Sequence, residues 1–187
     1  MGQVIHFEER AVARLRERLG AIEEANEDLI AFARGHWGAV ASIHSAALAA
    51  VDSRSLEALL RTVIDEWPPI LGIDSAALAL AVGGRAFHAS AAGVAVVERA
   101  WIERMLTGQP RVEFRAVARG HALFGAVRSP EIRAEALVRV DCPASLPIGL
   151  LALGQRCPFD IESGHGSELL LFLGRILAST ARRFSAG

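Results

Sequence analysis

Cysteine is scarce in this sequence, long apolar runs are absent, and neither sign of charge is in excess. The 187 residues include two cysteines, Cys142 and Cys157, which are too few for a disulfide scaffold and favour a reducing compartment. The apolar runs at residues 46–51 and 169–173 are far shorter than the roughly 18 residues that cross a membrane. The charged first twenty residues lack the apolar core of a signal peptide. We therefore expect a cytoplasmic protein without a membrane partner.

The balance of charge and the missing motifs exclude several classes of function. Lysine and arginine number 20 against 21 aspartate and glutamate residues, so no basic surplus attracts phosphate backbones, which argues against a nucleic-acid partner. The sequence has no GxxxxGK[ST] phosphate loop, no HExxH zinc motif and no GxSxG nucleophile motif. Its six histidines are scattered singly, without the spacing of metal ligands. We predict no catalytic residues, no metal site and no cofactor.

A heptad pattern occupies residues 12–33. Its seam positions alternate three and four residues apart, and they are Val12, Leu15, Leu19, Ile22, Asn26 and Leu29. Asn26 falls at an a position, where a buried amide that bonds its symmetry mate favours a parallel, in-register dimer. We predict that this long helix forms the interface of a homodimer. The alternative is an amphipathic helix that packs on its own domain, because Gly20 interrupts the short repeat.

Two glycines, Gly35 and Gly38, break the helical spacing that precedes the main apolar part of the chain. They predict a hinge, so we divide the chain into a dimerisation helix with its hinge at residues 1–38 and a globular domain at residues 39–187. A composition of 52% hydrophobic and 22% charged residues is typical of a folded protein. The length suits one compact domain of roughly 140 residues beside an extended helix.

The periodicity of the second part predicts an α+β domain, an antiparallel sheet flanked by helices. Apolar residues three and four apart indicate helices, two of which end at Pro68-Pro69 and Thr107-Gly108. Gly83-Gly84 between two short apolar segments indicates a β-hairpin. The predicted helices cover residues 40–51, 56–67, 94–106 and 167–184, and the predicted strands cover residues 75–82, 85–90, 135–140 and 148–155.

Two features of this part bear on function. His44 lies on the apolar stripe of its helix, and we expect it to be a core residue rather than a ligand. Residues 111–129 are irregular and hold several arginines with His121 and Phe124. We expect this segment to lie over a pocket, and the alternative is a solvated connector with one edge strand.

This order of elements resembles that of a GAF domain, and more specifically the chain is similar to the uncharacterised bacterial family DUF484. The resemblance is carried by short segments in a fixed order rather than by one motif. The segments are residues 43–60 (IHSAALAAVDSRSLEALL), 123–125 (LFG), 136–138 (ALV), 147–154 (PIGLLALG) and 164–170 (GHGSELL). The resemblance implies a GAF-like domain after an amino-terminal helix, with a sensory or adaptor role.

The resemblance supplies no catalytic residues, so we expect a non-enzymatic module that binds a small molecule or a protein partner. The NKFDE-type motif of cyclic-nucleotide-binding GAF domains is absent. One alternative is an enzyme like the GAF-type methionine sulfoxide reductases, in which Cys142 or Cys157 would react. Another is a purely structural interaction protein without a ligand.

Candidate ligand-binding residues come from the hairpin, the irregular segment and the strand after it. They are His88, Ser90, Phe124, Arg128 and Arg139. An arginine beside an apolar cavity suits an anionic small molecule through a bidentate contact. The alternative is that these arginines form salt bridges at the surface.

Overall fold

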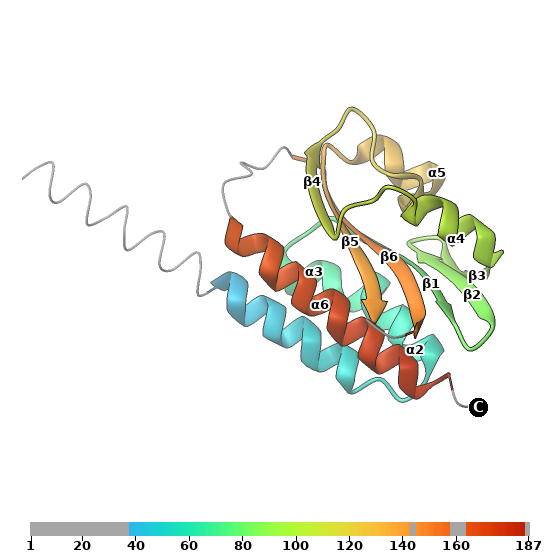
Figure 1. The fold of residues 1–187 in the computed structure, drawn as a ribbon. Coiled ribbons are helices and arrows are strands. Elements are labelled where there is room, and N and C mark those ends of the chain that lie inside the picture. Colours follow the sequence, from blue (N-terminus) through green and yellow to red (C-terminus); the bar gives the residue numbers. More distant parts are fainter. Residues whose placement is uncertain (1–37, 143–144, 158–163, 186–187) are drawn as a thin grey trace, which may run out of the picture. The chain divides into compact units, whose positions relative to one another are not determined.

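The domain is built on a central β-sheet with helices packed against it (Figure 1). The structure, a computed structural model, describes residues 38–142, 145–157 and 164–185. The chain divides into the units Met1–Val40 and Ala41–Gly187, and the sheet belongs to the second unit. The predicted dimer seam lies outside the described residues, as does most of the predicted hinge.

Six antiparallel strands form one sheet in the order β3-β2-β1-β6-β5-β4. Their bounds are β1 Ser75–Val82, β2 Arg85–Ser90, β3 Gly93–Val96, β4 Val112–Ala116, β5 Ala134–Cys142 and β6 Ser145–Gln155. The nearly continuous apolar sequence of β6 suits its central place, because a strand covered on both faces has no polar side. The predicted α+β class with an antiparallel sheet is confirmed.

The β1–β2 hairpin turns at the two glycines that predicted it. Gly83 has φ of 56° and Gly84 has φ of 77°, the pair of positive values that a two-residue type I′ turn requires. Val82 pairs with Arg85 directly across the turn. The turn therefore fixes the register of both strands and puts His88 opposite Ala79.

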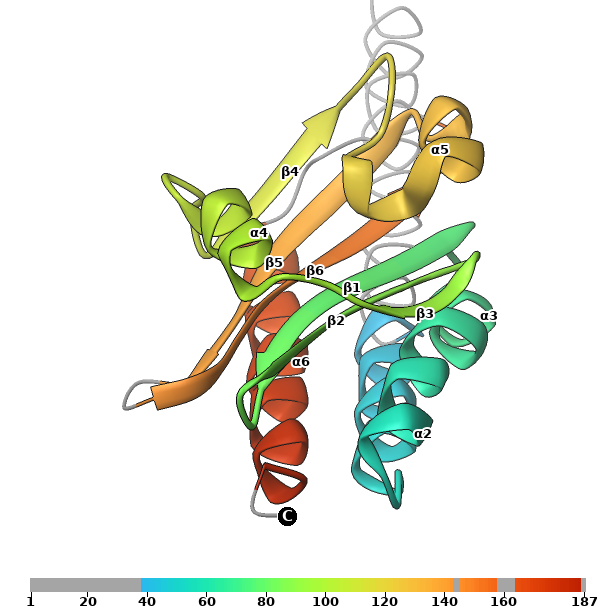
Figure 2. The same cartoon turned by 90° about the vertical axis from the view of Figure 1, so that its right-hand side faces the viewer.

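Helices cover one face of the sheet (Figure 2). They are the helical residues 38–51 and the elements α2 Leu56–Arg61, η1 Thr62–Glu66, α3 Trp67–Leu71 and α6 Gly164–Arg183. Trp67 is completely buried in this layer, and its indole Nε1 donates a hydrogen bond of 3.0 Å to the carbonyl oxygen of Ala46. The bond joins the first helix to the α2–η1–α3 segment at the centre of the core.

The predicted end of a helix at Pro68-Pro69 is wrong. One π-helical turn, η1, precedes α3, and the prolines are the second and third residues of α3, within its first turn. A proline there costs little, because the first turn of a helix has backbone N–H groups without intrahelical partners. The segment ends instead at Gly72, which has φ of 66° and closes the helix in the left-handed conformation.

Two further expectations need correction. The predicted helix at residues 94–106 is an edge strand, β3, followed by the shorter helix α4 Arg99–Leu106, because pairing with β2 outweighs the helical spacing of its apolar residues. His44 is exposed rather than in the core. The neighbouring Ile43, Ala46 and Ala47 are the buried residues of that helix turn.

The opposite face of the sheet is covered by α4 and by a segment that we call the cover segment, residues 117–133 (Figure 2). It contains η2 Ala122–Phe124, α5 Gly125–Arg128 and η3 Ser129–Glu131. Ala77, Ala79 and Ala81 of β1 lie beneath this layer in one buried cluster with Leu123 and Phe124. Small side chains on the central strand let the cover segment approach the sheet closely. No helix among the described residues has the length and apolarity to cross a membrane.

Candidate functional site

Two histidines from different elements bond the backbone of one buried residue, Leu123. The His88 ring on β2 donates from Nε2 to the Leu123 carbonyl oxygen over 2.8 Å. His121 Nδ1 accepts a bond of 3.2 Å from the Leu123 backbone N–H, which caps the short helix η2. Leu123 itself is completely buried. Both polar backbone groups of this residue are thus satisfied by imidazoles, which hold the cover segment to the sheet.

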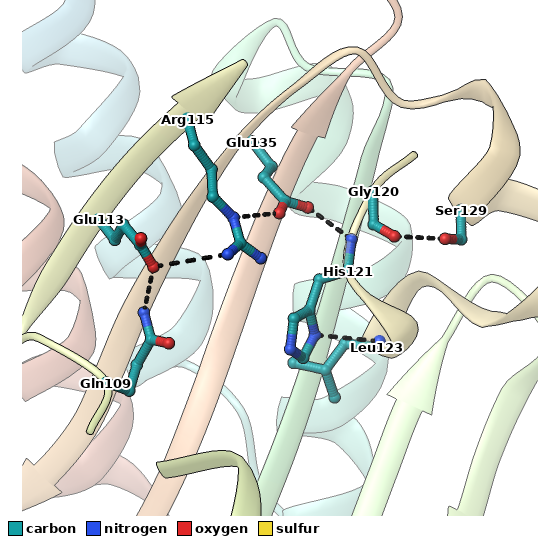
Figure 3. A network of polar contacts seen from close by, with 8 residues as sticks. All are labelled: Gln109, Glu113, Arg115, Gly120, His121, Leu123, Ser129 and Glu135. Carbon is teal, nitrogen blue, oxygen red and sulfur yellow. Dashed lines mark hydrogen bonds and ion pairs between the residues drawn. The ribbon is translucent and has the colours of Figure 1, made fainter. Parts of the chain in front are cut away.

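The carboxylate of Glu135 anchors the same segment from β5 (Figure 3). Glu135 is completely buried, and Oε1 lies 2.7 Å from Arg115 Nε while Oε2 accepts a bond of 2.6 Å from the His121 backbone N–H. A buried carboxylate is tolerated only with such partners. The ion pair joins β4 to β5, and the second oxygen ties the cover segment to the strand.

A second carboxylate extends this network toward the sheet edge (Figure 3). Glu113 Oε2 lies 3.8 Å from Arg115 Nη1 and accepts a bond of 2.8 Å from Gln109 Nε2. Arg115 therefore lies between two carboxylates on neighbouring positions of β4 and β5. Its side chain is 37% exposed, so this end of the network reaches solvent.

Burial lowers the pKa of His121 below its ordinary value of 6.5. The carboxylate of Glu135 opposes that shift, the Arg115 guanidinium adds to it, and Glu113 opposes it. The hydrogen bond to Nδ1 requires the same neutral form, because an imidazolium has no lone pair to accept it. His121 is therefore neutral in this arrangement and carries its proton on Nε2.

The outer end of the cover segment is held by two hydrogen bonds between Gly120 and Ser129. Ser129 Oγ donates to the Gly120 carbonyl oxygen, and the Gly120 N–H donates to the Ser129 carbonyl oxygen over 2.8 Å. A Cβ on Gly120 would lie 2.7 Å from Ile132 Cβ, so only glycine fits at this closure. The segment is thus a closed loop between Gly120 and Ser129 with η2 as its inner part.

Three of the predicted ligand residues lie together on this face. Phe124 packs on the backbone of β6, where a Cβ on Gly154 would lie 2.8 Å from Phe124 Cζ. Ser90 is buried, and its Oγ would lie 3.9 Å from a Cβ on Gly125. His88 and Ser90 therefore meet the inner part of the cover segment, to which Phe124 belongs.

The two predicted arginines have other partners. Arg128 Nη1 lies 3.1 Å from Glu131 Oε2 within the cover segment. Arg139 Nη1 donates to the carbonyl oxygens of Leu106 and Gln109 over 3.1 and 3.2 Å, at the end of α4, where a cation also complements the helix dipole. A role for all five residues in ligand binding stays a prediction, and none of them lines the surface cavities of about 420 and 780 Å³ at residues 55–57 and 51–54.

Sequence reasoning missed Glu135 and Trp101, and it noted Arg115 and His121 only as members of an irregular stretch. The Trp101 ring of α4 lies 5.3 Å from the His88 ring. A usable signal existed for Glu135, because a carboxylate in an apolar strand needs a buried partner. The described residues contain no group of three His, Cys, Asp or Glu side chains that could hold a metal ion.

Comparison with known proteins gives a family and several fold neighbours. The profile of the family described as "Protein of unknown function, DUF484" matches residues 1–186. A search of curated proteins finds no match. Among solved structures, the GAF domain of a two-component sensor histidine kinase from Bacillus halodurans is similar, with 13% sequence identity and a TM-score of 0.48. The alignment covers 69% of this chain and 95% of that one.

Proposed function

The chain belongs to the DUF484 family of proteins of unknown function, and we propose that it is a non-enzymatic, GAF-like sensory or adaptor module. Its binding surface is the sheet face under the cover segment, and its ligand is a small molecule. A protein partner receives the signal. The order of helices and strands after residue 38 supports the GAF-like part of this proposal, because apart from the added edge strands β3 and β4 it follows the order expected from the sequence.

The observation that carries the proposal is the pair of hydrogen bonds between two imidazoles and one residue. His88 and His121 bind the carbonyl and the N–H of Leu123, which belongs to a buried apolar cluster. A few convergent polar groups on an apolar surface are the usual composition of a small-molecule site. A ligand that replaces one of these bonds would move the cover segment relative to the sheet. Ligand binding would thus be coupled to a conformational change.

The proposal includes a homodimer formed through the amino-terminal helix. The heptad spacing of its seam and the asparagine at position 26 support a parallel pair. Sedimentation equilibrium of the full chain tests this part, with Leu19→Glu as the disrupting variant. A protein that is monomeric at micromolar concentration, or a dimer that Leu19→Glu leaves unchanged, would contradict it.

Thermal denaturation in the presence of a metabolite library tests ligand binding. A compound that binds the native state raises Tm, and at about one hundred times its Kd the stabilisation is about 2.7 kcal/mol, a shift of several degrees. His88→Ala should lose the shift, while the matched control His44→Ala, at an exposed position, should keep it. If no compound shifts Tm, the purely structural alternative replaces the sensor.

The enzyme alternative has its own test. Cys157 is exposed, and exposure is one of the conditions of a reactive thiol. Incubation with free methionine sulfoxide and a dithiol reductant should give no methionine in the wild type. Formation of methionine that stops in the Cys157→Ser or Cys142→Ser variant would overturn the non-enzymatic assignment.

A further inference from the structure

A surface groove of about 420 Å³ lies between α2 and the strands β2 and β3. Small-molecule sites have volumes of roughly 300 to 1,000 Å³, so this groove can hold a compact organic ligand. Its apolar residues pack against the core cluster of the helical layer, on the opposite face of the sheet from the cover segment (Figure 2). We call it the α2 groove, and it is separate from the site proposed above.

The walls of the α2 groove are largely apolar. Leu56 and Leu60 come from α2, Phe87 from β2 and Val94 from β3. Leu60 is buried, whereas the other three are partly exposed. Val96 is 75% exposed and is the cross-strand partner of Phe87, so its side chain extends the apolar surface on the same face. A ligand with an apolar body would remove this surface from water, which favours binding.

Arg85, at the start of β2, gives the α2 groove a positive charge. Its guanidinium carbon lies over the Phe87 ring, 5.4 Å from the ring centre, in a cation–π contact. The residue is exposed, and within the part of the chain that the structure describes it has no carboxylate partner. Because the ring attracts the charge of the guanidinium without occupying its N–H donors, these donors remain available for an anion.

Two further polar side chains line the groove, and neither opposes an anion strongly. Ser55 Oγ accepts a bond of 3.1 Å from the Ala58 N–H, which leaves its hydroxyl proton for another acceptor. Glu57 Oε1 lies 3.5 Å from Arg61 Nε, so its negative charge is offset within α2. The polar groups that can recognise a ligand are thus a cation and a hydroxyl donor.

We propose that the α2 groove binds an organic carboxylate with an apolar body. The carboxylate accepts hydrogen bonds from Arg85, in the planar, bidentate geometry that guanidinium and carboxylate groups share. The apolar body lies against Phe87 and Val94. The proposal is independent of any ligand under the cover segment, because the two sites are on opposite faces of the sheet.

Nuclear magnetic resonance of the isotope-labelled full chain tests the proposal. The probe is phenylacetate, and phenylacetamide is the uncharged control of nearly the same shape. Phenylacetate should shift the backbone resonances of α2 and of the residues around Arg85 saturably, with a Kd of about 1 mM for a ligand of this size. Phenylacetamide should bind about tenfold more weakly or not at all, because it lacks the charge that the guanidinium binds.

Substitution of the arginine gives a second measurement. Arg85→Gln should raise the Kd of phenylacetate about tenfold or more, and Arg85→Lys, which keeps the charge without the planar fork, should raise it less. The matched control Arg99→Gln, at an exposed arginine of α4, should leave Kd unchanged. The spectrum of each variant without ligand verifies that the domain is folded.

Four results would overturn the proposal. They are the absence of saturable shifts at about ten times the expected Kd, equal binding of phenylacetate and phenylacetamide, an unchanged Kd in Arg85→Gln, and shifts confined to His88, Leu123 and the rest of the cover segment. The last result would place the carboxylate in the site of the proposed function instead of the α2 groove. Shifts at α2 and Arg85 alone leave the cover-segment site to its own test.

Discussion

Arg115 and Glu135 are direct cross-strand partners on β4 and β5, and their ion pair of 2.7 Å is buried only on the glutamate side. Arg115→Ala removes the charge that neutralises the buried carboxylate. We expect a loss of about 2 kcal/mol, below the cost of breaking a fully buried pair because the arginine is partly exposed. Urea denaturation measures it. Arg99→Ala, which breaks an exposed pair with Glu103, is the control and should cost less than about 1 kcal/mol.

His121 predicts how stability changes with pH. Its pKa in the folded protein is below the ordinary value of 6.5, so the unfolded chain binds more protons as pH falls past 6.5 and the folded state loses stability. His121→Asn keeps an oxygen that caps η2 but does not titrate. Between about pH 7.5 and about pH 5.5, the wild type should lose more unfolding free energy than this variant.

The exposed His44 supplies the control for that titration. His44→Asn should follow the wild-type pH dependence, because the change leaves His121 intact. Denaturant midpoints at each pH give the comparison. If His121→Asn and the wild type show the same slope against pH, the neutral, buried state of His121 is wrong.

Replacing Gly174 by alanine should lower stability, although helix propensity alone would favour alanine. Alanine in a helix is usually favoured over glycine by about 1 kcal/mol, but a Cβ on Gly174 of α6 would lie 2.9 Å from the Arg139 carbonyl oxygen on β5. Gly174→Ala should therefore lower Tm, since the helix must move away from the sheet. Gly38→Ala has nothing within 4 Å of the added Cβ and should not lower it. Stabilisation by Gly174→Ala would show that α6 packs less closely than described.

The hydrogen bond from Trp67 to the Ala46 carbonyl oxygen should contribute measurably to stability. Trp67→Phe keeps most of the apolar volume but removes the donor to the Ala46 carbonyl oxygen, which leaves that acceptor buried without this partner. We expect a loss of about 1 kcal/mol from the missing hydrogen bond, since the carbonyl oxygen lies within a helix and keeps its helical partner, with some further loss from the smaller ring. Thermal unfolding followed by circular dichroism measures it. An unchanged Tm would mean that the bond contributes nothing to stability.

The sequence predicted elements whose signals are local. The Gly83-Gly84 hairpin, the central strand β6 and the closing helix α6 follow from turn chemistry or from apolar spacing within one segment. Edge strand β3 could not be found in this way, because its pairing with β2 competes with a helical spacing of similar strength. The π-helical turn before Pro68 likewise has no periodic signal.

The candidate site was predicted in part for the same reason. His88, Ser90 and Phe124 were chosen as polar or aromatic residues next to a hairpin and an irregular segment, and they do lie together. The bond between His121 and Glu135 joins residues 14 positions apart, and its geometry depends on the closed loop between Gly120 and Ser129. Arg139 was chosen for its charge. Residue spacing alone could not predict that it donates hydrogen bonds to carbonyl oxygens at the end of α4.

The place of β6 in the sheet has a consequence for biosynthesis. β1 and β5 do not pair with each other, and β6 lies between them although it follows both in the sequence. A ribosome must therefore deliver the chain through Gln155 before the two parts of the sheet can join, and until then both β1 and β5 have an unpaired edge. Pairing over such sequence separations is slow, and the exposed edges are the surfaces through which nascent chains aggregate. The emerging protein thus depends on its last strand for protection as well as for its final structure.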